Sequence, residues 1–217
     1  MGMTDPARTA PQSDSTPRGA LNQITRIGLI SDTHCAGSGR DLPARVLEAL
    51  SGVDLILHCG DLECLGVLDY LETVAPVLAV RGYEDPREPG KRLADATRVV
   101  DAGGLAIGMI HDIQWPGPKI ATSRDGTELV LPEGRAHSLL AAKFGRPVDV
   151  VLFGDTHEEL VCSWDDVLMI NPGSPTYPGR RHRRGALGTI GLLEAGSGGV
   201  NACIIDLETG ETSTSYG

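Results

Sequence analysis

The chain has 217 residues, of which 41% are hydrophobic and 22% are charged, as in ordinary soluble globular proteins. Its 19 basic and 29 acidic side chains give a formal net charge of -10, which makes nucleic acid an unlikely partner because a polyanion is repelled. Aromatic residues are only 4% of the chain, which argues against a surface built for aromatic stacking.

The chain begins with a segment that is poor in apolar residues. Residues 1–23 are rich in Pro, Ser, Thr, Asp and Gly, which predicts a disordered leader before a single domain over residues 24–217. The apolar run over 24–34 then predicts a buried parallel strand. We expect a helix next, with Asp41 as its N-cap and Leu50 near its end.

Strands and helices continue to alternate after this helix. A second buried strand is predicted over 53–61, apolar residues at helical spacing follow over 63–74, and a third strand is expected over 77–85. This order is typical of a parallel α/β sheet.

The pattern then changes. Residues 98–112 predict two strands joined by a Gly-Gly turn, which is antiparallel chemistry and would start a second sheet. Residues 113–134 contain three prolines and three glycines without periodicity, so we expect a long loop. A helix over 135–144 and a strand over 148–157 are predicted to follow.

The C-terminal part alternates short strands with turns. The expected strands cover 159–164, 167–174, 186–195 and 200–208. Two mixed β-sheets packed together, with helices on the outside, accommodate all of these elements. We therefore predict an α/β fold, a four-layer α/β/β/α sandwich.

The cysteines indicate a reducing environment. Cys35, Cys59, Cys64, Cys162 and Cys203 form no CxxC pair and no even-numbered framework. No stretch approaches the roughly 20 apolar residues of a membrane span, and the N-terminus lacks the layout of a signal peptide. These features predict a cytoplasmic protein with no membrane partner.

Acidic residues and histidines stand at the ends of four predicted strands. They are Asp32, His34, Asp61, His111, Asp155 and His157. Strand ends in α/β sheets bring residues that are distant in sequence to one crevice, so we expect these side chains to meet. Imidazole nitrogen combined with carboxylate oxygen suits Zn, Mn or Fe. His58, by contrast, lies inside a predicted strand and is expected to be a hydrogen-bonded core residue.

In their order, these residues resemble the pattern of the calcineurin-like metallophosphoesterases, and within them the small bacterial and archaeal phosphodiesterase branch. The family pattern runs DxH, GD, GN with an acid after it, H, and GHxH. The chain has counterparts at 32–34, 60–61, 82–85, 111 and 154–157, and it has the Asn-Pro-Gly-Ser turn of the branch at 171–174. The likeness covers roughly residues 25–207.

The resemblance implies up to two divalent metal ions per chain, Mn, Zn or Fe. The first ion would be held by Asp32, His34, Asp61 and His157. The second would be held by Asp61 as a bridge, by His111, by Asp155 and by an asparagine of the family pattern. Such a pair of ions clamps a phosphoryl group and makes a nucleophile from bound water.

The chain departs from the family pattern at the second ion. Asp155 replaces a histidine but can still coordinate, whereas Tyr83 replaces the asparagine, and a phenol with a pKa of about 10 is a poor ligand. Either Glu84 or Asp85 supplies the missing oxygen, or Tyr83 donates a hydrogen bond to a phosphate oxygen of the substrate. Glu84 also stands where the family often has a general-acid histidine, which implies a lower rate or a narrower range of leaving groups.

The function implied by the resemblance is hydrolysis of small phosphate esters by attack of a metal-bound hydroxide, with phosphodiesters favoured. We assign Asp61 and Asp85 to catalysis. The run 179–185, GRRHRRG, is either a solvated loop or a phosphate clamp in which Arg180 and Arg181 bind the substrate together with Tyr83.

Two alternatives stay open. In one, the departures at Tyr83 and Asp155 mean that the fold has lost catalysis and serves as a binding scaffold. In the other, the chain is an enzyme with one tight and one weak metal ion. A homo-oligomer is also compatible with the sequence.

Overall fold

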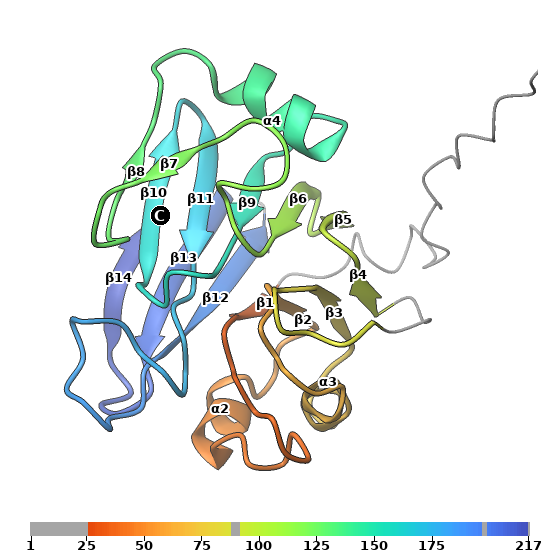
Figure 1. Ribbon diagram of the computed structural model, residues 1–217, viewed down its shortest axis with the longest axis vertical. Helices are drawn as coiled ribbons and strands as arrows, with labels where there is room; N and C mark the ends of the chain where they lie inside the picture. Colours follow the sequence, from red (N-terminus) through yellow and green to blue (C-terminus); the bar gives the residue numbers. More distant parts are fainter. Residues whose placement is uncertain (1–25, 88–91, 197–198, 217) are drawn as a thin grey trace, which may run out of the picture.

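The computed structural model describes residues 26–87, 92–196 and 199–216 (Figure 1). The predicted leader over residues 1–23 lies outside these residues. The assignment of residues 24–217 to a single domain stays a prediction.

The larger sheet has seven strands in the order β14-β13-β12-β1-β2-β3-β4. Their bounds are β1 (Arg26–Ile30), β2 (Leu55–His58), β3 (Val77–Val80), β4 (Leu93–Ala94), β12 (Thr189–Gly196), β13 (Gly199–Asp206) and β14 (Thr212–Tyr216). β1 to β4 pair in parallel, as the alternation of strands and helices predicts. β12 joins the other edge of β1 in antiparallel pairing, and β13 and β14 continue antiparallel, so the sheet is mixed.

Two short helices connect the parallel strands, α2 (Ala44–Ala49) and α3 (Gly66–Leu71). Both are shorter than predicted. The N-cap of α2 is Pro43, so the prediction that Asp41 caps this helix is wrong. The reason is local, since a residue that precedes proline is kept out of the helical region, and the helix begins only after Pro43.

The smaller sheet has five strands in the order β10-β11-β9-β6-β5. Their bounds are β5 (Thr97–Ala102), β6 (Leu105–Ile110), β9 (Val150–Leu152), β10 (Leu160–Trp164) and β11 (Val167–Asn171). β5 and β6 form the expected hairpin, and its turn needs glycine because Gly103 and Gly104 have φ angles of 60° and 79°. β6, β9 and β11 pair in parallel, and α4 (Ala136–Phe144) precedes β9.

Three short elements were not predicted. The expected loop 113–134 contains β7 (Ala121–Thr122) and β8 (Leu129–Val130), which pair with each other, and β4 is another strand of two residues. Strands this short leave no alternating pattern in a sequence. β14, with the sequence TSTSY, has no apolar alternation either, and it forms by pairing with β13.

Apolar clusters show how the sheets and helices pack. Leu29 of the larger sheet and Ile107 of the smaller one belong to the same buried cluster, which lies between the sheets. Val46 of α2 and Leu68 of α3 pack in a cluster on the other face of the larger sheet, and Leu140 of α4 packs in a third cluster against the smaller sheet. The prediction of an α/β fold with two mixed sheets and helices is confirmed.

Two further properties concern the whole described chain. All five cysteines are free thiols. Within the residues that the structure describes, no helix has the length and apolar character needed to cross a membrane.

Candidate metal centre

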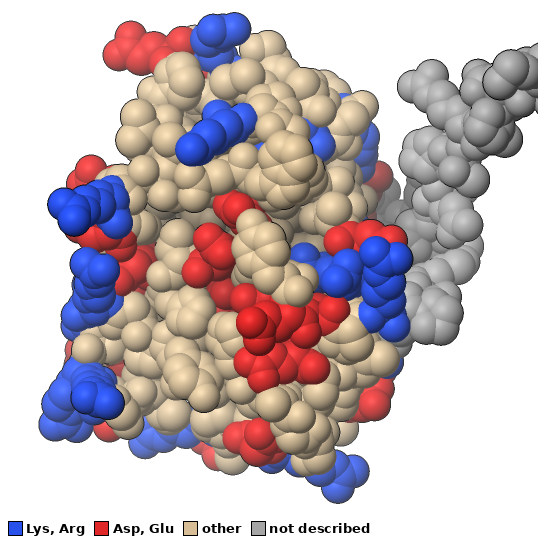
Figure 2. Space-filling view, in the orientation of Figure 1, with Lys and Arg blue, Asp and Glu red and all other residues tan. Residues whose placement is uncertain are grey.

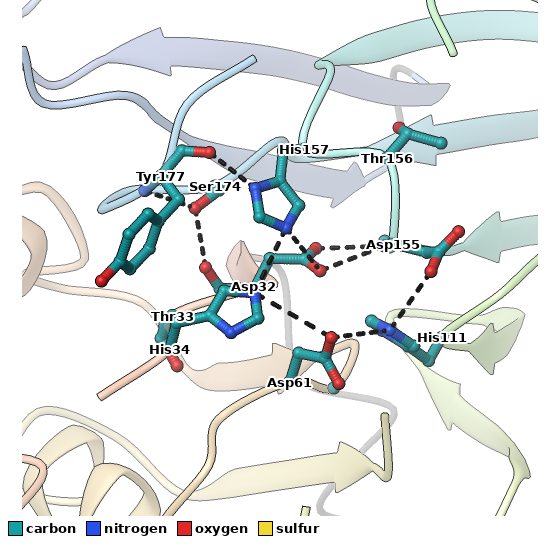
Figure 3. Close-up of polar contacts among 12 residues, drawn as sticks. Asp32, Thr33, His34, Asp61, His111, Asp155, Thr156, His157, Ser174 and Tyr177 are labelled. Carbon is teal, nitrogen blue, oxygen red and sulfur yellow. Dashed lines mark hydrogen bonds and ion pairs between the residues drawn. The ribbon is translucent and has the colours of Figure 1, made fainter. Parts of the chain in front are cut away.

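The site residues follow the carboxyl ends of strands from both sheets (Figure 3). β1 and β2 end at Ile30 and His58, before the residues that the sequence analysis placed within longer strands. The loops after them lie side by side, because the amide of Asp32 donates to the carbonyl of Gly60 at 2.9 Å and the amide of His34 to that of Asp61 at 3.0 Å. The loops after β6 and β9 are joined in the same way. Both sheets therefore contribute to one group of side chains.

The backbone of these loops is strained. Asp32, His34, Asp61, Asp155 and His157 have φ angles of 53°, 44°, 54°, 70° and 60°. They are five of the seven non-glycine residues with positive φ in the described part of the chain. A sixth, Glu63, lies two residues after Asp61 in the loop that follows β2. Residues with a Cβ rarely adopt this conformation, and where they cluster they usually mark a functional site.

The three histidines are held so that the same ring nitrogen faces the centre. Nδ1 of His34 lies 2.8 Å from a carboxylate oxygen of Glu63, Nδ1 of His111 lies 2.8 Å from the carbonyl of Cys59, and Nδ1 of His157 lies 2.7 Å from the carbonyl of Tyr177. Since these oxygens accept hydrogen bonds, each Nδ1 carries the proton. Nε2 is then left as the metal-binding atom, which is how metal-ligating histidines are usually oriented.

The Nε2 atoms meet one another and the carboxylates. Nε2 of His34 and Nε2 of His157 are 3.2 Å apart, so two lone pairs face each other unless a cation or a proton lies between them. Nε2 of His111 is buried, lies 3.2 Å from Oδ2 of Asp61, and makes no hydrogen bond because the contact is out of line. In Figure 3 these side chains point toward a common centre. Such a donor set fits a divalent ion of the Zn, Mn or Fe type.

The donors form two groups that share one residue. Asp32, His34 and His157 make the first group, and Asp32, Asp61 and His111 make the second. The donor atoms of each group lie within 4.8 Å of one another. Oδ2 of Asp61 is also 3.9 Å from Nε2 of His34, so Asp61 can serve both groups.

The pKa values of the site residues show that negative charge is concentrated at the centre. Burial raises the pKa of Asp32 and that of Asp155. Burial acts on Asp61 in the same direction, but the charge of the nearby His111 imidazole brings its pKa to about 2. Burial by itself lowers the pKa of His111, yet the carboxylates of Asp61 and Asp32 raise it to about 9. The raised pKa values show that, without a metal, this cluster of buried carboxylates retains protons. A divalent ion would neutralise the same carboxylates more completely.

Asp155 lies at the edge of this centre. Its Oδ1 is 3.8 Å from Nε2 of His111, and its side chain is 32% exposed. Its amide donates to the carboxylate of Asp32 at 3.2 Å. Asp155 is therefore near enough to be an additional oxygen ligand beside His111.

Asp85 does not face the donors. Its Oδ1 accepts the amides of Leu62 at 2.7 Å and Glu63 at 2.8 Å, and its Oδ2 accepts those of Asp61 at 2.9 Å and Gly82 at 2.8 Å. Both oxygens are thus occupied by backbone, so the assignment of Asp85 to catalysis does not fit its position. Asp85 is instead a positioning residue that fixes the loop carrying Asp61.

Tyr83 stands beside the centre without entering it. Its ring contacts that of His111 edge-on at 5.6 Å, its hydroxyl donates to Oδ2 of Asp112 at 2.6 Å, and 62% of the residue is exposed. Glu84 reaches Asp61 only through its backbone amide, at 3.4 Å. In the described part of the chain, neither donor group includes a carboxylate oxygen of Glu84 or Asp85.

The two arginines proposed as a clamp differ in their surroundings. Arg180 lines an open cavity beside His157. Arg181, in contrast, turns toward Glu159, with Nη1 3.7 Å from its carboxylate and 3.4 Å from its carbonyl oxygen. The structure therefore does not bring these two side chains together at one place.

Two further parts of the chain support the centre: Glu63, which was not found from the sequence, and the Asn-Pro-Gly-Ser turn, which was. Glu63 orients His34, and the only available signal was an acidic residue two positions after Asp61. The Asn-Pro-Gly-Ser turn supports the centre through its two ends, because Asn171 donates to the carbonyl of Gly154 at 3.0 Å and Ser174 to that of Asp32 at 2.7 Å.

Comparison with known proteins agrees with this geometry. The profile of the calcineurin-like phosphoesterase superfamily domain matches residues 25–197. A protein of Methanocaldococcus jannaschii described as a probable metallophosphoesterase is 36% identical over 153 residues, which are 70% of this chain and 69% of the relative. A phosphodiesterase of the same organism is 32% identical over 155 residues, which are 68% of this chain and 82% of the relative.

Solved structures show the same fold at lower identity. Vps29 of Entamoeba histolytica, solved in complex with zinc, superposes with a TM-score of 0.61 and 21% identity. The alignment covers 88% of this chain and 97% of Vps29. At this identity the likeness concerns the fold alone.

Proposed function

Because the chain belongs to the calcineurin-like phosphoesterase superfamily, we propose that it is a metal-dependent hydrolase of phosphodiesters. The observation that carries the proposal is the orientation of the three histidines, whose Nδ1 atoms are all occupied and whose Nε2 atoms meet buried carboxylates. A purely structural histidine cluster would satisfy both ring nitrogens with hydrogen bonds. The relative named as a phosphodiesterase supports the choice of diester over monoester.

The residues that would hold the ions are those of the two donor groups. Asp32, His34 and His157, with Asp61 within reach, would hold one ion. Asp32, Asp61 and His111 would hold the other, with Asp155 beside them. When bound, divalent ions polarise phosphoryl oxygens and lower the pKa of a coordinated water toward neutrality.

The side chains around the ions have separate tasks in this proposal. Glu63 fixes the His34 ring, which keeps its Nε2 directed at the centre. Arg180 lies where its guanidinium can contact an anionic substrate beside His157. Neither donor group holds a free histidine that could protonate a leaving group, because all three histidines are committed as ligands. We therefore expect the chain to favour alcohols with low pKa, such as phenols, as leaving groups.

The decisive experiment is metal content by elemental mass spectrometry on protein purified without chelators, together with hydrolysis of bis-(p-nitrophenyl) phosphate and p-nitrophenyl phosphate. We expect bound divalent metal and Mn-stimulated turnover, faster for the diester. Glu133→Gln serves as a control variant, since it removes an exposed acidic charge away from the donors. Turnover of neither ester at any Mn concentration would sink the proposal.

A binding scaffold is the second candidate, and one observation favours it. Tyr83 turns its hydroxyl to Asp112, so the second donor group has no replacement for the family asparagine. In that case metal would bind at the first group only, and turnover would be absent. The same two measurements therefore separate the candidates.

We further propose that the substrate is a small phosphate ester handled in the cytoplasm. The five free thiols fit a reducing compartment. Fractionation of cells that produce the tagged chain would test this placement, and recovery from an oxidising compartment would contradict it.

A further inference from the structure

An open cavity adjoins the metal centre on the side of His157. Its volume is about 430 Å³, enough for a phosphate together with a group the size of a sugar. Its wall includes the basic residues Arg180 and Arg184, the histidines His157 and His182, and the acidic residues Asp125 and Glu158. Because His157 belongs both to the first donor group and to this wall, a substrate bound at the metals can extend directly into the cavity.

The arginine-rich segment that forms much of this wall is anchored. The amide of Gly179 donates to the carbonyl of His157 at 3.0 Å, and the amide of Arg180 donates to the carboxylate of Glu158 at 2.6 Å. His182 is held by Glu159, with Nε2 3.2 Å from Oε2. The segment is thus tied to the chain just after the metal ligand His157, which argues against a freely solvated loop.

The acidic residues of the wall are occupied by other groups. Oδ1 of Asp125 accepts hydrogen bonds from the hydroxyls of Ser123 and Thr127, at 2.7 and 2.8 Å. Glu158 is 2% exposed, its Oε1 is taken by the amide of Arg180, and its Oε2 is buried without a hydrogen bond. A Cβ on Gly179 would lie 2.3 Å from the Glu158 carboxyl carbon, so the backbone of Gly179 covers this carboxylate.

The basic residues of the run 179–185 differ in their side-chain partners. Arg181 and His182 pair with Glu159. Arg180 and Arg184 line the cavity, are exposed, and have no side-chain hydrogen bond or ion pair within the described residues. In Figure 2, Lys and Arg gather along the left edge of the molecule, the side on which Figure 1 shows the loop between β11 and β12, while Asp and Glu occupy the middle of this face.

We propose that this cavity binds a second anionic group of the substrate, a phosphate, through the guanidinium groups of Arg180 and Arg184. Guanidinium forks bind phosphate with two parallel hydrogen bonds, and these two are the cavity's donors that lack a protein partner. The inference rests on the proposed phosphodiesterase function and narrows its substrate class. The substrate is then a phosphodiester that carries a further phosphate monoester on one of its alcohols.

The test compares two substrates that differ by one phosphate. They are the p-nitrophenyl ester of thymidine 5'-phosphate and the same ester with an additional 3'-phosphate. We expect kcat/KM to be at least about tenfold higher for the second substrate, mainly through KM, which is the scale of one charge-assisted hydrogen bond. Arg180→Gln combined with Arg184→Gln should bring the ratio of the two substrates close to one.

Arg183→Gln is the control for each single variant, Arg180→Gln or Arg184→Gln, because it removes one charge from the same run without lining the cavity. It should keep the preference for the 3'-phosphate. An equal loss in the control and in the single variants would show a general charge effect and overturn the inference. So would the absence of any preference in the wild-type chain.

Failure of the proposed function is distinguishable from failure of this inference. If the wild-type chain hydrolyses neither ester, the proposed function is refuted. Calorimetry then tests separately whether the cavity binds a second phosphate. Thymidine 3',5'-bisphosphate should then bind at least about tenfold more tightly than thymidine 5'-phosphate. That difference should vanish in the double variant, and equal affinities in the wild-type chain would overturn the inference.

Discussion

The two donor groups of the metal centre share Asp32 but differ in how completely they are built. In the first, His34 and His157 face each other and both are oriented by oxygen acceptors. In the second, His111 is oriented in the same way, but the neighbouring position holds Tyr83, whose hydroxyl turns to Asp112. The first group therefore has two oriented imidazoles, whereas the second has one and depends more on carboxylates.

The difference shows that the first donor group keeps the residue types of the family pattern, whereas the second departs from them. A group that combines two imidazoles with a carboxylate binds borderline ions such as Zn and Mn strongly. A group that combines one imidazole with two or three carboxylates is harder and more negative. We therefore expect unequal affinities for the two ions. The following predictions test the residues within reach of both groups, those that support them and those that distinguish them, from the largest effect to the smallest.

Asp61→Asn should have the largest effect of the four variants below, because Asp61, like Asp32, is within reach of both groups. Losing its charge removes several kcal/mol of stabilisation, so kcat/KM for bis-(p-nitrophenyl) phosphate should fall by about a thousandfold or more. Steady-state kinetics with saturating Mn measures this change. A fall below about tenfold would show that Asp61 is not shared between the ions.

Asp85→Asn should lower stability by about 3 kcal/mol, because an amide offers one acceptor oxygen where the carboxylate holds four backbone amides. Urea unfolding measures the free energy of unfolding. Asp95→Asn is the matched control. Asp95 is exposed and its one ion pair, to Arg81 at 3.7 Å, lies at the surface, where such pairs contribute little to stability. Equal stability of the two variants would refute the positioning role.

Glu63→Gln should weaken the first ion selectively, since Glu63 orients His34 and has no contact with His111. Loss of such an outer carboxylate typically costs about 10- to 100-fold in metal affinity. Calorimetric titration with Mn measures the affinities of both ions. Asp112→Asn is the counterpart for the second donor group. The Asp112 side chain accepts a hydrogen bond from Tyr83 and acts on the donor Asp155 only through its charge, so its effect on affinity should be small.

Tyr83→Asn should give the smallest effect and the opposite sign. The variant restores the amide oxygen that the family pattern implies, so the second ion should bind about fivefold more tightly, a gain of about 1 kcal/mol. The expected result is half-maximal activation at a lower Mn concentration. An unchanged Mn dependence would mean that the asparagine position does not limit the second ion in this chain.

The sequence also predicted a good part of the architecture, and the reasons are local. Buried strands such as Val150–Leu152 are continuous apolar runs, and the hairpin around Gly103 carries its own turn chemistry. Elements without a local pattern were missed, as in β14, which exists because its backbone pairs with β13. The start of α2 was misplaced because Pro43 overrode the capping potential of Asp41.

For the site, the sequence by itself determined which side chains are available and in what order, because residue type and strand ends are encoded locally. Only the tertiary structure decided their roles. Asp85 became a support for backbone amides, Arg181 paired with Glu159 while Arg180 stayed available, and Tyr83 turned to Asp112. Each of these outcomes depends on which loop lies next to the residue in space, and contacts between segments 20 or more positions apart leave no periodic trace in the chain.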